Sequence, residues 1–266
     1  MNSWTGVAEQ AAREAGKILL AMQGRIVARE KAPADLVTEA DVAAQQRIAE
    51  ILLEAFPDHG FIGEEDSLPP KRRKAAEYTW IVDPLDGTTN YVHGLDNFGV
   101  SIALRRESAM SAERGSIVAG VVFDPIRDEC FTAREHEGAF CNGARLRVSI
   151  VNRLDQALVA ASLPARVEPD SAEVRRFLAV LYRCQALRRM GSAALNLCYV
   201  AAGKLDAYWA TSVKTWDVAA GALLVTEAGG TVSALDGTPF DDREPKLVAC
   251  STPALQLEML ACLKST

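Results

Sequence analysis

The spacing of apolar residues predicts two helices at the start of the chain. Apolar side chains recur every three to four residues from Val7 to Met22, with Gly24 as a stop signal, and again from Glu39 to Phe56. This period places them on one face of an α-helix, so both segments are expected to be amphipathic helices that pack on a core.

After the second helix the apolar period shortens to that of β-strands. The strands expected in this part are 79–83, 98–104, 116–123 and 129–133, followed by a hairpin turn at 139–143. Two helices followed by such a run of strands are typical of an α+β unit. We therefore predict an α+β sub-domain over residues 1–145.

Beyond Val148 strands and helices alternate. The strands expected here are 157–162, 206–210 and 246–251, and the helices are 171–182, 192–201, 217–227 and a last one from residue 253. Alternation of this kind indicates an α/β unit, so residues 146–266 are predicted to form a second sub-domain packed on the first.

The composition is that of a soluble globular protein. Of 266 residues, 49% are hydrophobic and 24% are charged, and 29 Lys and Arg against 35 Asp and Glu give a net charge of −6. This acidic balance argues against nucleic acid or an anionic membrane as the main partner. The charged N-terminal stretch is unlike a signal peptide, and no apolar run is long enough to cross a bilayer. The six cysteines lack paired spacing, which favours reduced thiols in a cytoplasmic protein.

One acidic segment, DPLDGTTN at 83–90, carries the most specific chemical signal. An apolar strand is expected to end at Asp83, and Asp86 follows just before Gly87. The backbone amides of Gly87 and Thr88 can face an anion at such a turn. Carboxylates beside those amides would repel a phosphate unless a cation lay between them, so the segment predicts Mg²⁺. Asp217, at the start of a later helix, is placed to add another oxygen ligand.

Several of these groups also have simpler interpretations. Asp217 suits a helix cap, and Thr38 and Asp41 have the spacing of a capping box. The loop at 65–66 and the basic run at 71–74 suit solvated loops, the latter in preference to a nucleic-acid patch because no aromatic residues interleave with it. The three histidines show no zinc-ligand spacing, and neither a nucleophile elbow nor a Walker loop occurs.

Five motifs together resemble the inositol monophosphatase family of Mg²⁺-dependent, lithium-sensitive phosphatases. They stand in that family's order and spacing over nearly the whole chain: DLVTEAD (35–41), FIGEED (61–66), WIVDPLDGTTNYVHG (80–94), GAFCNG (138–143) and WDVAAGALLVTEAGG (216–230). The resemblance implies the five-layered αβαβα sandwich of the inositol monophosphatase and fructose-1,6-bisphosphatase type. It also implies a homodimer.

The same resemblance implies roles for particular residues. The metal ligands for two to three Mg²⁺ ions would be Glu64, Asp83, the carbonyl of Leu85, Asp86 and Asp217. The phosphate would be held by the amides of Gly87 and Thr88. Catalysis would use Asp41, Thr88 and Glu64, with Lys31 as a basic residue near the site. The implied reaction is hydrolysis of a phosphomonoester by direct attack of metal-activated water, without a phosphoenzyme.

The alcohol side of the site is less well determined by the sequence. Gly191, Ser192 and Ala193 match the segment that lines it, Asp86 also borders it, and Arg188 and Lys214 are expected neighbours or surface residues. Relatives that prefer inositol phosphate usually carry an acid seven residues before the Asp of Trp-Asp, where this chain has Ala210. Inositol 1-phosphate is therefore the leading substrate, with histidinol phosphate, another sugar phosphate or a nucleotide 3'-phosphate as alternatives.

Two other functions stay open at this point. A haloacid-dehalogenase-type phosphatase would use Asp83 as a nucleophile. Its acids stand two residues apart and share a strand face, whereas Asp83 and Asp86 are three apart. A regulatory protein associated with RNA or RNA polymerase, built on this phosphatase fold, is the alternative from another class. The complete set of expected metal ligands favours catalysis.

Overall fold

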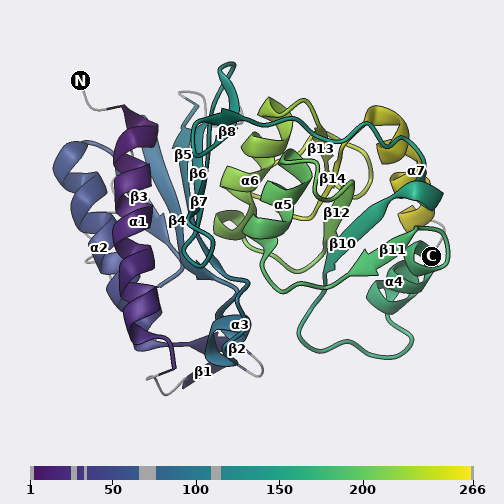
Figure 1. The fold of residues 1–266 in the computed structure, drawn as a ribbon, viewed down its shortest axis with the longest axis horizontal. Coiled ribbons are helices and arrows are strands. Elements are labelled where there is room, and N and C mark those ends of the chain that lie inside the picture. Colours follow the sequence, from purple (N-terminus) through teal and green to yellow (C-terminus); the bar gives the residue numbers. More distant parts are fainter. Residues whose placement is uncertain (1–2, 25–28, 33–34, 66–75, 109–114, 265–266) are drawn as a thin grey trace.

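The computed structural model describes residues 3–24, 29–32, 35–65, 76–108 and 115–264, which form five stacked layers (Figure 1). Helices α1 (Trp4–Met22) and α2 (Glu39–Ala55) cover one face of a seven-stranded sheet. Helices α5 (Ala193–Ala201) and α6 (Thr215–Glu227) separate it from a five-stranded sheet. Helices α4 (Ala172–Leu181) and α7 (Pro253–Lys264) form the outer layer. The predicted αβαβα sandwich is confirmed.

The strands of the first sheet follow one another in sequence order. Its strands, in spatial order, are β3 (Gly60–Gly63), β4 (Tyr78–Asp86), β5 (Gly99–Arg106), β6 (Ser116–Asp124), β7 (Glu129–Arg134), β8 (Gly138–Cys141) and β9 (Ala144–Arg145). Every neighbouring pair is antiparallel except β3 and β4, which run parallel. The parallel pair brings the end of β3 beside the end of β4, where the acidic motif lies.

The second sheet is mixed. Its order is β11 (Ala186–Arg188), β10 (Leu158–Ser162), β12 (Ala207–Ala210), β14 (Leu247–Cys250) and β13 (Thr231–Ser233). Strand β10 is parallel to both of its neighbours, and the remaining pairs are antiparallel. The described elements are completed by the ribbon β1 (Arg29–Ala32) and β2 (Asp35–Val37), the short helix α3 (Thr88–Val92), and a 3₁₀ turn at Leu154–Gln156.

The middle layer explains why two helices read as apolar on all sides. All nine residues of α5 are buried, because a sheet covers each of its faces. Helix α6 packs against it closely at Gly221, where a Cβ atom would lie 2.5 Å from Cβ of Leu197. The helix that carries Asp217 is thus held firmly in the middle of the molecule.

Most predicted long elements are present, and the differences concern short segments. Helix α6 begins at Thr215, two residues before the predicted start, and β4 does not end at Asp83 but continues to Asp86. The ribbon β1–β2, strands β3, β11 and β13, and helix α3 were not predicted, because three to five residues carry too little periodicity. The sub-domain boundary at residue 145 stays a prediction. In the described part of the chain, no helix has the length and apolar character needed to cross a membrane.

Candidate functional site

A bulge at the end of β4 places the two aspartates of the acidic motif. Asp83 pairs with Ser101 and Asp86 with Gly99, so three residue steps on β4 match two steps on β5. Because side chains alternate along a regular strand, residues three apart would face opposite ways; the extra residue removes that alternation. The Leu85 amide donates to Oδ1 of Asp83 at 3.0 Å, which closes the local turn.

Four carboxylates from three elements meet at this bulge. Glu64 follows β3, and its amide donates to the Val82 carbonyl at 3.1 Å, which sets it beside β4. Burial raises the pKa of Asp83 well above its usual value, and the charges of Glu64, Asp86 and Asp217 raise it further. Burial is also the main cause of the raised pKa of Asp217, and the charge of Asp86 raises it further. The four expected metal carboxylates are therefore neighbours that repel one another.

The chemistry of this donor set fits Mg²⁺. All the groups are hard oxygen donors, and a cation would offset the repulsion that raises their pKa values. One oxygen of each aspartate is held by the protein: Oδ1 of Asp83 by Leu85, Oδ2 of Asp217 by the Lys214 amide at 2.8 Å, and Oδ2 of Asp86 as described below. Across the described ranges, no group of three or more Asp, Glu, His or Cys side chains is arranged so that it could hold a metal ion as it stands.

The expected phosphate-binding amides belong to a turn that requires glycine. Gly87 precedes α3 with φ of 100°, a left-handed conformation that side chains strongly disfavour. A Cβ atom there would also lie 3.0 Å from the carbonyl oxygen of Asn97. The turn connects the end of β4 at Asp86 to the first residue of α3, Thr88, so the amides of Gly87 and Thr88 follow Asp86 directly in the chain.

Asp41 and Thr88 are brought together although they lie 47 residues apart. The Thr38 amide and hydroxyl donate to Oδ2 of Asp41 at 2.8 and 2.6 Å, which confirms the capping box at the start of α2. The Thr88 hydroxyl lies 3.4 Å from the other oxygen, Oδ1, and 3.1 Å from the Leu85 carbonyl. Burial raises the pKa of Asp41 to about 6, against the opposing effect of the Thr38 hydrogen bonds. Asp41 therefore serves as a cap and also faces the site.

The expected alcohol-side segment lies directly on Asp86. Ser192 caps α5 by accepting from the Leu195 amide, and its hydroxyl donates to Oδ2 of Asp86 at 2.6 Å. The Ala194 amide donates to the same oxygen at 2.7 Å. Burial raises the pKa of Asp86 to about 6, although these donors lower it. The structure thus joins the end of β4 to the start of α5.

The remaining expected residues belong to other elements than the bulge of β4. Ala210 is fully buried at the end of β12, and Lys214 is exposed at the start of α6. Arg188 is exposed, and its Nη1 donates to the neighbouring Leu187 carbonyl. Lys31 lies in β1, and Asp66 and the basic run at 71–74 lie outside the described residues.

Two amide side chains at the site were not predicted. Gln45, on α2, accepts from the Glu65 amide and donates to the Glu65 carbonyl, so it fixes the loop that carries Glu64. Glu65 is buried, so the solvated loop predicted for 65–66 is wrong at this residue. Asn90, on α3, donates to the carbonyls of Asn97 and Met190, both at 2.7 Å. Asn90 is the last residue of the motif at 83–90, which is the one sequence signal that pointed toward it.

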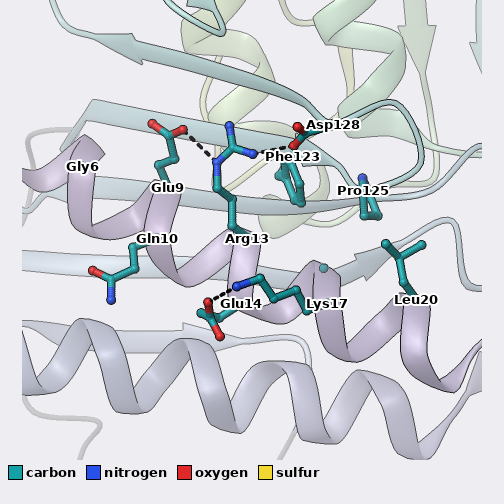
Figure 2. A pocket seen from close by; sticks show the side chains of 11 residues that line it. Gly6, Glu9, Gln10, Arg13, Glu14, Lys17, Leu20, Phe123, Pro125 and Asp128 are labelled. Atoms are coloured by element: carbon teal, nitrogen blue, oxygen red, sulfur yellow. Dashed lines mark hydrogen bonds and ion pairs between the residues drawn. The ribbon is translucent and has the colours of Figure 1, made fainter.

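A separate pocket lies between α1 and the turn that connects β6 to β7 (Figure 2). Arg13 spans it between Glu9, at 2.9 Å, and Asp128, at 2.6 Å. Its charged groups pair largely among themselves, and none of the lining residues belongs to the acidic site.

The comparisons with known proteins agree with this geometry. Residues 1–265 match the inositol monophosphatase family. The inositol-1-monophosphatase of Caulobacter vibrioides is 38% identical over 96% of this chain and 99% of its own length. The Nus factor SuhB of Pseudomonas aeruginosa is 41% identical over 90% of this chain and 88% of its own.

Solved structures show the same likeness. The extragenic suppressor protein suhB of Bartonella henselae superposes with a TM-score of 0.86 at 37% identity, over 97% of each chain. The IMPase of Thermotoga maritima superposes with a TM-score of 0.84 at 31% identity, over 97% of this chain and 95% of its own. By sequence and by fold, this chain belongs to the inositol monophosphatase family.

Proposed function

We propose that the chain is a Mg²⁺-dependent phosphomonoesterase that hydrolyses a small phosphorylated alcohol, with inositol 1-phosphate as the leading substrate. The observation that carries this proposal is the meeting of Glu64, Asp83, Asp86 and Asp217 beside the Gly87 turn. Four carboxylates that repel one another lie together where a cation and a phosphate would bind, and this costly arrangement favours a catalytic over a structural role.

The proposed metal ligands are those four carboxylates and the carbonyl of Leu85, which together would hold two to three Mg²⁺ ions. Bound there, Mg²⁺ supplies Lewis-acid chemistry: it offsets the phosphate charge and makes water easier to deprotonate. The protein orients these ligands through donors already in place, such as the Lys214 amide on Asp217 and the Leu85 amide on Asp83.

The remaining steps rest on the chain's own groups. The amides of Gly87 and Thr88 would hold the phosphoryl oxygens. The Thr88 hydroxyl, held near Asp41 and the Leu85 carbonyl, would orient the attacking water and pass its proton toward Asp41. Asp41, with a pKa near 6, is ionised at neutral pH and can accept it. The alcohol would leave on the side of Ser192 and take its proton from solvent.

Substrate choice depends on the alcohol side, where Ala210 contributes no hydrogen bond. A lost clamp of this kind costs about 1 to 3 kcal/mol of discrimination, so histidinol phosphate, other sugar phosphates and nucleotide 3'-phosphates remain alternatives. The test is a phosphate-release screen over inositol 1-phosphate and these three alternative classes, with Mg²⁺, with chelator and with lithium. Chelator-resistant hydrolysis, or none with any ester, would contradict the proposal.

We also propose a cytoplasmic homodimer, as the family resemblance implies. Helix α4 offers a surface for it: of its ten residues only Val180 is buried, while Leu178, Leu181 and the adjoining Tyr182 are exposed. A second copy covering this face would remove apolar area from water.

The relatives named Nus factor SuhB favour a second candidate function, association with the transcription machinery. The Pseudomonas aeruginosa relative of that name is as similar to this chain as the relatives named for the phosphatase. Co-purification of the chain with RNA polymerase, repeated with Asp83→Asn, tests it. Co-purification of both the wild type and Asp83→Asn with RNA polymerase supports a role independent of catalysis, and absence of any complex argues against it.

A further inference from the structure

Two chain segments 100 residues apart run side by side next to the acidic site. One is 86–90, which holds Asp86 and the Gly87 turn, and the other is 190–194, which leads into α5. Asp86 joins them at one end by accepting from Ser192 and Ala194. Asn90 joins them at the other end by donating to the Met190 carbonyl at 2.7 Å.

The Met190 carbonyl is held more firmly than one hydrogen bond would hold it. Asn97 donates to the same oxygen at 3.0 Å, so two side-chain amides converge on it. Both N–H groups of Asn90 are used, one on Met190 and one on the Asn97 carbonyl, which links the three residues into a closed set. The orientation of the Met190–Gly191 peptide is therefore fixed from the side of α3.

The next residue fits this arrangement only as glycine. Gly191 has φ of 89°, and a Cβ atom there would lie 2.8 Å from Nδ2 and 2.9 Å from Oδ1 of Asn90. A trans peptide is planar, so its N–H points away from its C=O. With the Met190 carbonyl turned toward Asn90 and Asn97, the Gly191 N–H points the opposite way.

That N–H is available to a ligand. Gly191 is exposed, and within the described residues its amide makes no hydrogen bond. It immediately precedes Ser192, which contacts Asp86. An oriented donor of this kind, one residue from the acidic site, can donate to a hydroxyl oxygen of a substrate at little entropic cost.

We propose that Asn90, supported by Asn97, is a positioning residue that locks the Met190–Gly191 peptide so that the Gly191 N–H binds a hydroxyl of the substrate alcohol. The inference rests on the proposed phosphatase function. It assigns selectivity for hydroxylated alcohols to a pair of side chains that touch neither the proposed metal ions nor the phosphate.

The test compares two esters, myo-inositol 1-phosphate and phenyl phosphate, whose alcohol carries no further hydroxyl. Asn90→Ala releases the peptide, so KM for inositol 1-phosphate should rise about three- to tenfold, as expected for one lost oriented hydrogen bond. The kcat for this ester and both constants for phenyl phosphate should change by less than about twofold. Asn97→Ala removes one of the two bonds to Met190 and should give a smaller change in the same direction.

The control is Gln256→Ala, which removes an amide hydrogen bond of 3.0 Å to Ser233 in the outer layer. It should leave both esters unaffected. Equal losses with both esters in Asn90→Ala, in step with a lowered melting temperature, would show a merely structural role and overturn the inference. If Asn90→Ala does not fold, the change in KM for inositol 1-phosphate relative to that for phenyl phosphate is measured in Asn97→Ala instead, and the same criterion applies. If the wild type cleaves neither ester, the proposed function is contradicted as well. If the wild type cleaves both esters and only the difference between the variants is missing, the inference alone fails.

Discussion

Asp83 is a buried carboxyl group whose charged form destabilises the fold. It is 2% exposed, and burial together with three facing carboxylates raises its pKa. An acid with a raised folded-state pKa stabilises the fold at low pH and loses that contribution as pH rises through its folded-state pKa. Above that pH the charged form destabilises the metal-free protein.

We therefore predict that Asp83→Asn raises the melting temperature of the metal-free chain while it lowers turnover by orders of magnitude. Neutralising the side chain removes the repulsion, but it also removes a proposed metal ligand. Thermal melts in chelator and in Mg²⁺ check the prediction. Mg²⁺ should stabilise the wild type more than the variant. A variant that melts lower than wild type in chelator, or that keeps normal hydrolysis, contradicts it.

The pKa of Asp41 gives a pH prediction. As the proposed proton acceptor it must be ionised, so kcat should fall as pH drops through about 6, where Asp41 becomes protonated. Thr38→Val removes a hydroxyl whose hydrogen bond lowers this pKa, so the acidic limb should move to higher pH. Rate profiles at saturating Mg²⁺ measure both. An unshifted limb in Thr38→Val would assign that limb to another group.

At the scale of single residues, the sequence predicted the acidic side chains but not the amide side chains of Gln45 and Asn90. Carboxylates next to a glycine turn form a recognisable local pattern, as in the segment at 83–90. Gln45 and Asn90 act on backbone groups 20 and 100 residues away, and such partners leave no spacing in the sequence.

Among the elements, the first turn of α6 depends on a buried ion pair. Arg105, on β5, pairs with Asp242 at 2.9 Å, and the side chains of both are less than a tenth exposed. Asp242 also accepts from the hydroxyl of Thr215, the first residue of α6. The pair thus connects the first sheet with the turn that presents Asp217.

We predict that Arg105→Met lowers the free energy of unfolding by about 3 to 5 kcal/mol, because Asp242 is left as a buried charge without its main partner. The double variant Arg105→Met with Asp242→Leu should recover most of this loss, since Asp242 is no longer an unpaired buried charge and Glu107, the other partner of Arg105, keeps its ion pair with Arg243. Urea unfolding of both variants and of Asp242→Leu completes the cycle. A single variant as stable as wild type would show that the ion pair is dispensable.

The elements that the sequence predicted well are the long, strongly periodic ones, such as α1, α2 and β6. The end of β4 was missed for a physical reason: the bulge between Asp83 and Asp86 is defined by pairing with β5, not by local propensity. Helix α3 has only five residues, so its stability comes from contacts such as those of Asn90.

For the molecule as a whole, the layer order followed from the resemblance and is confirmed, whereas the assembly remains a proposal. If α4 forms the dimer face, the double variant Leu178→Asp with Tyr182→Asp should be a monomer, because two charges would be buried in an apolar contact. Leu257→Asp is the matched control: it is a 70% exposed leucine on α7 of the same layer. Sedimentation equilibrium distinguishes the masses. A dimeric double variant, or a monomeric wild type, contradicts the assignment.

The placement of Asp217 opposite Asp83 has a consequence for the lifetime of the protein. Asp217 belongs to the middle helical layer and Asp83 to the first sheet, so when both are ionised their repulsion acts between the two layers, while the side-chain hydrogen bond between them opposes it. A cation bound between the two carboxylates would offset this repulsion and so stabilise the contact between the layers, in addition to its proposed role in the reaction. If the proposed Mg²⁺ ions bind there, their removal should also make the contact between the two layers easier to open, and the metal-free chain should be cut faster by proteases.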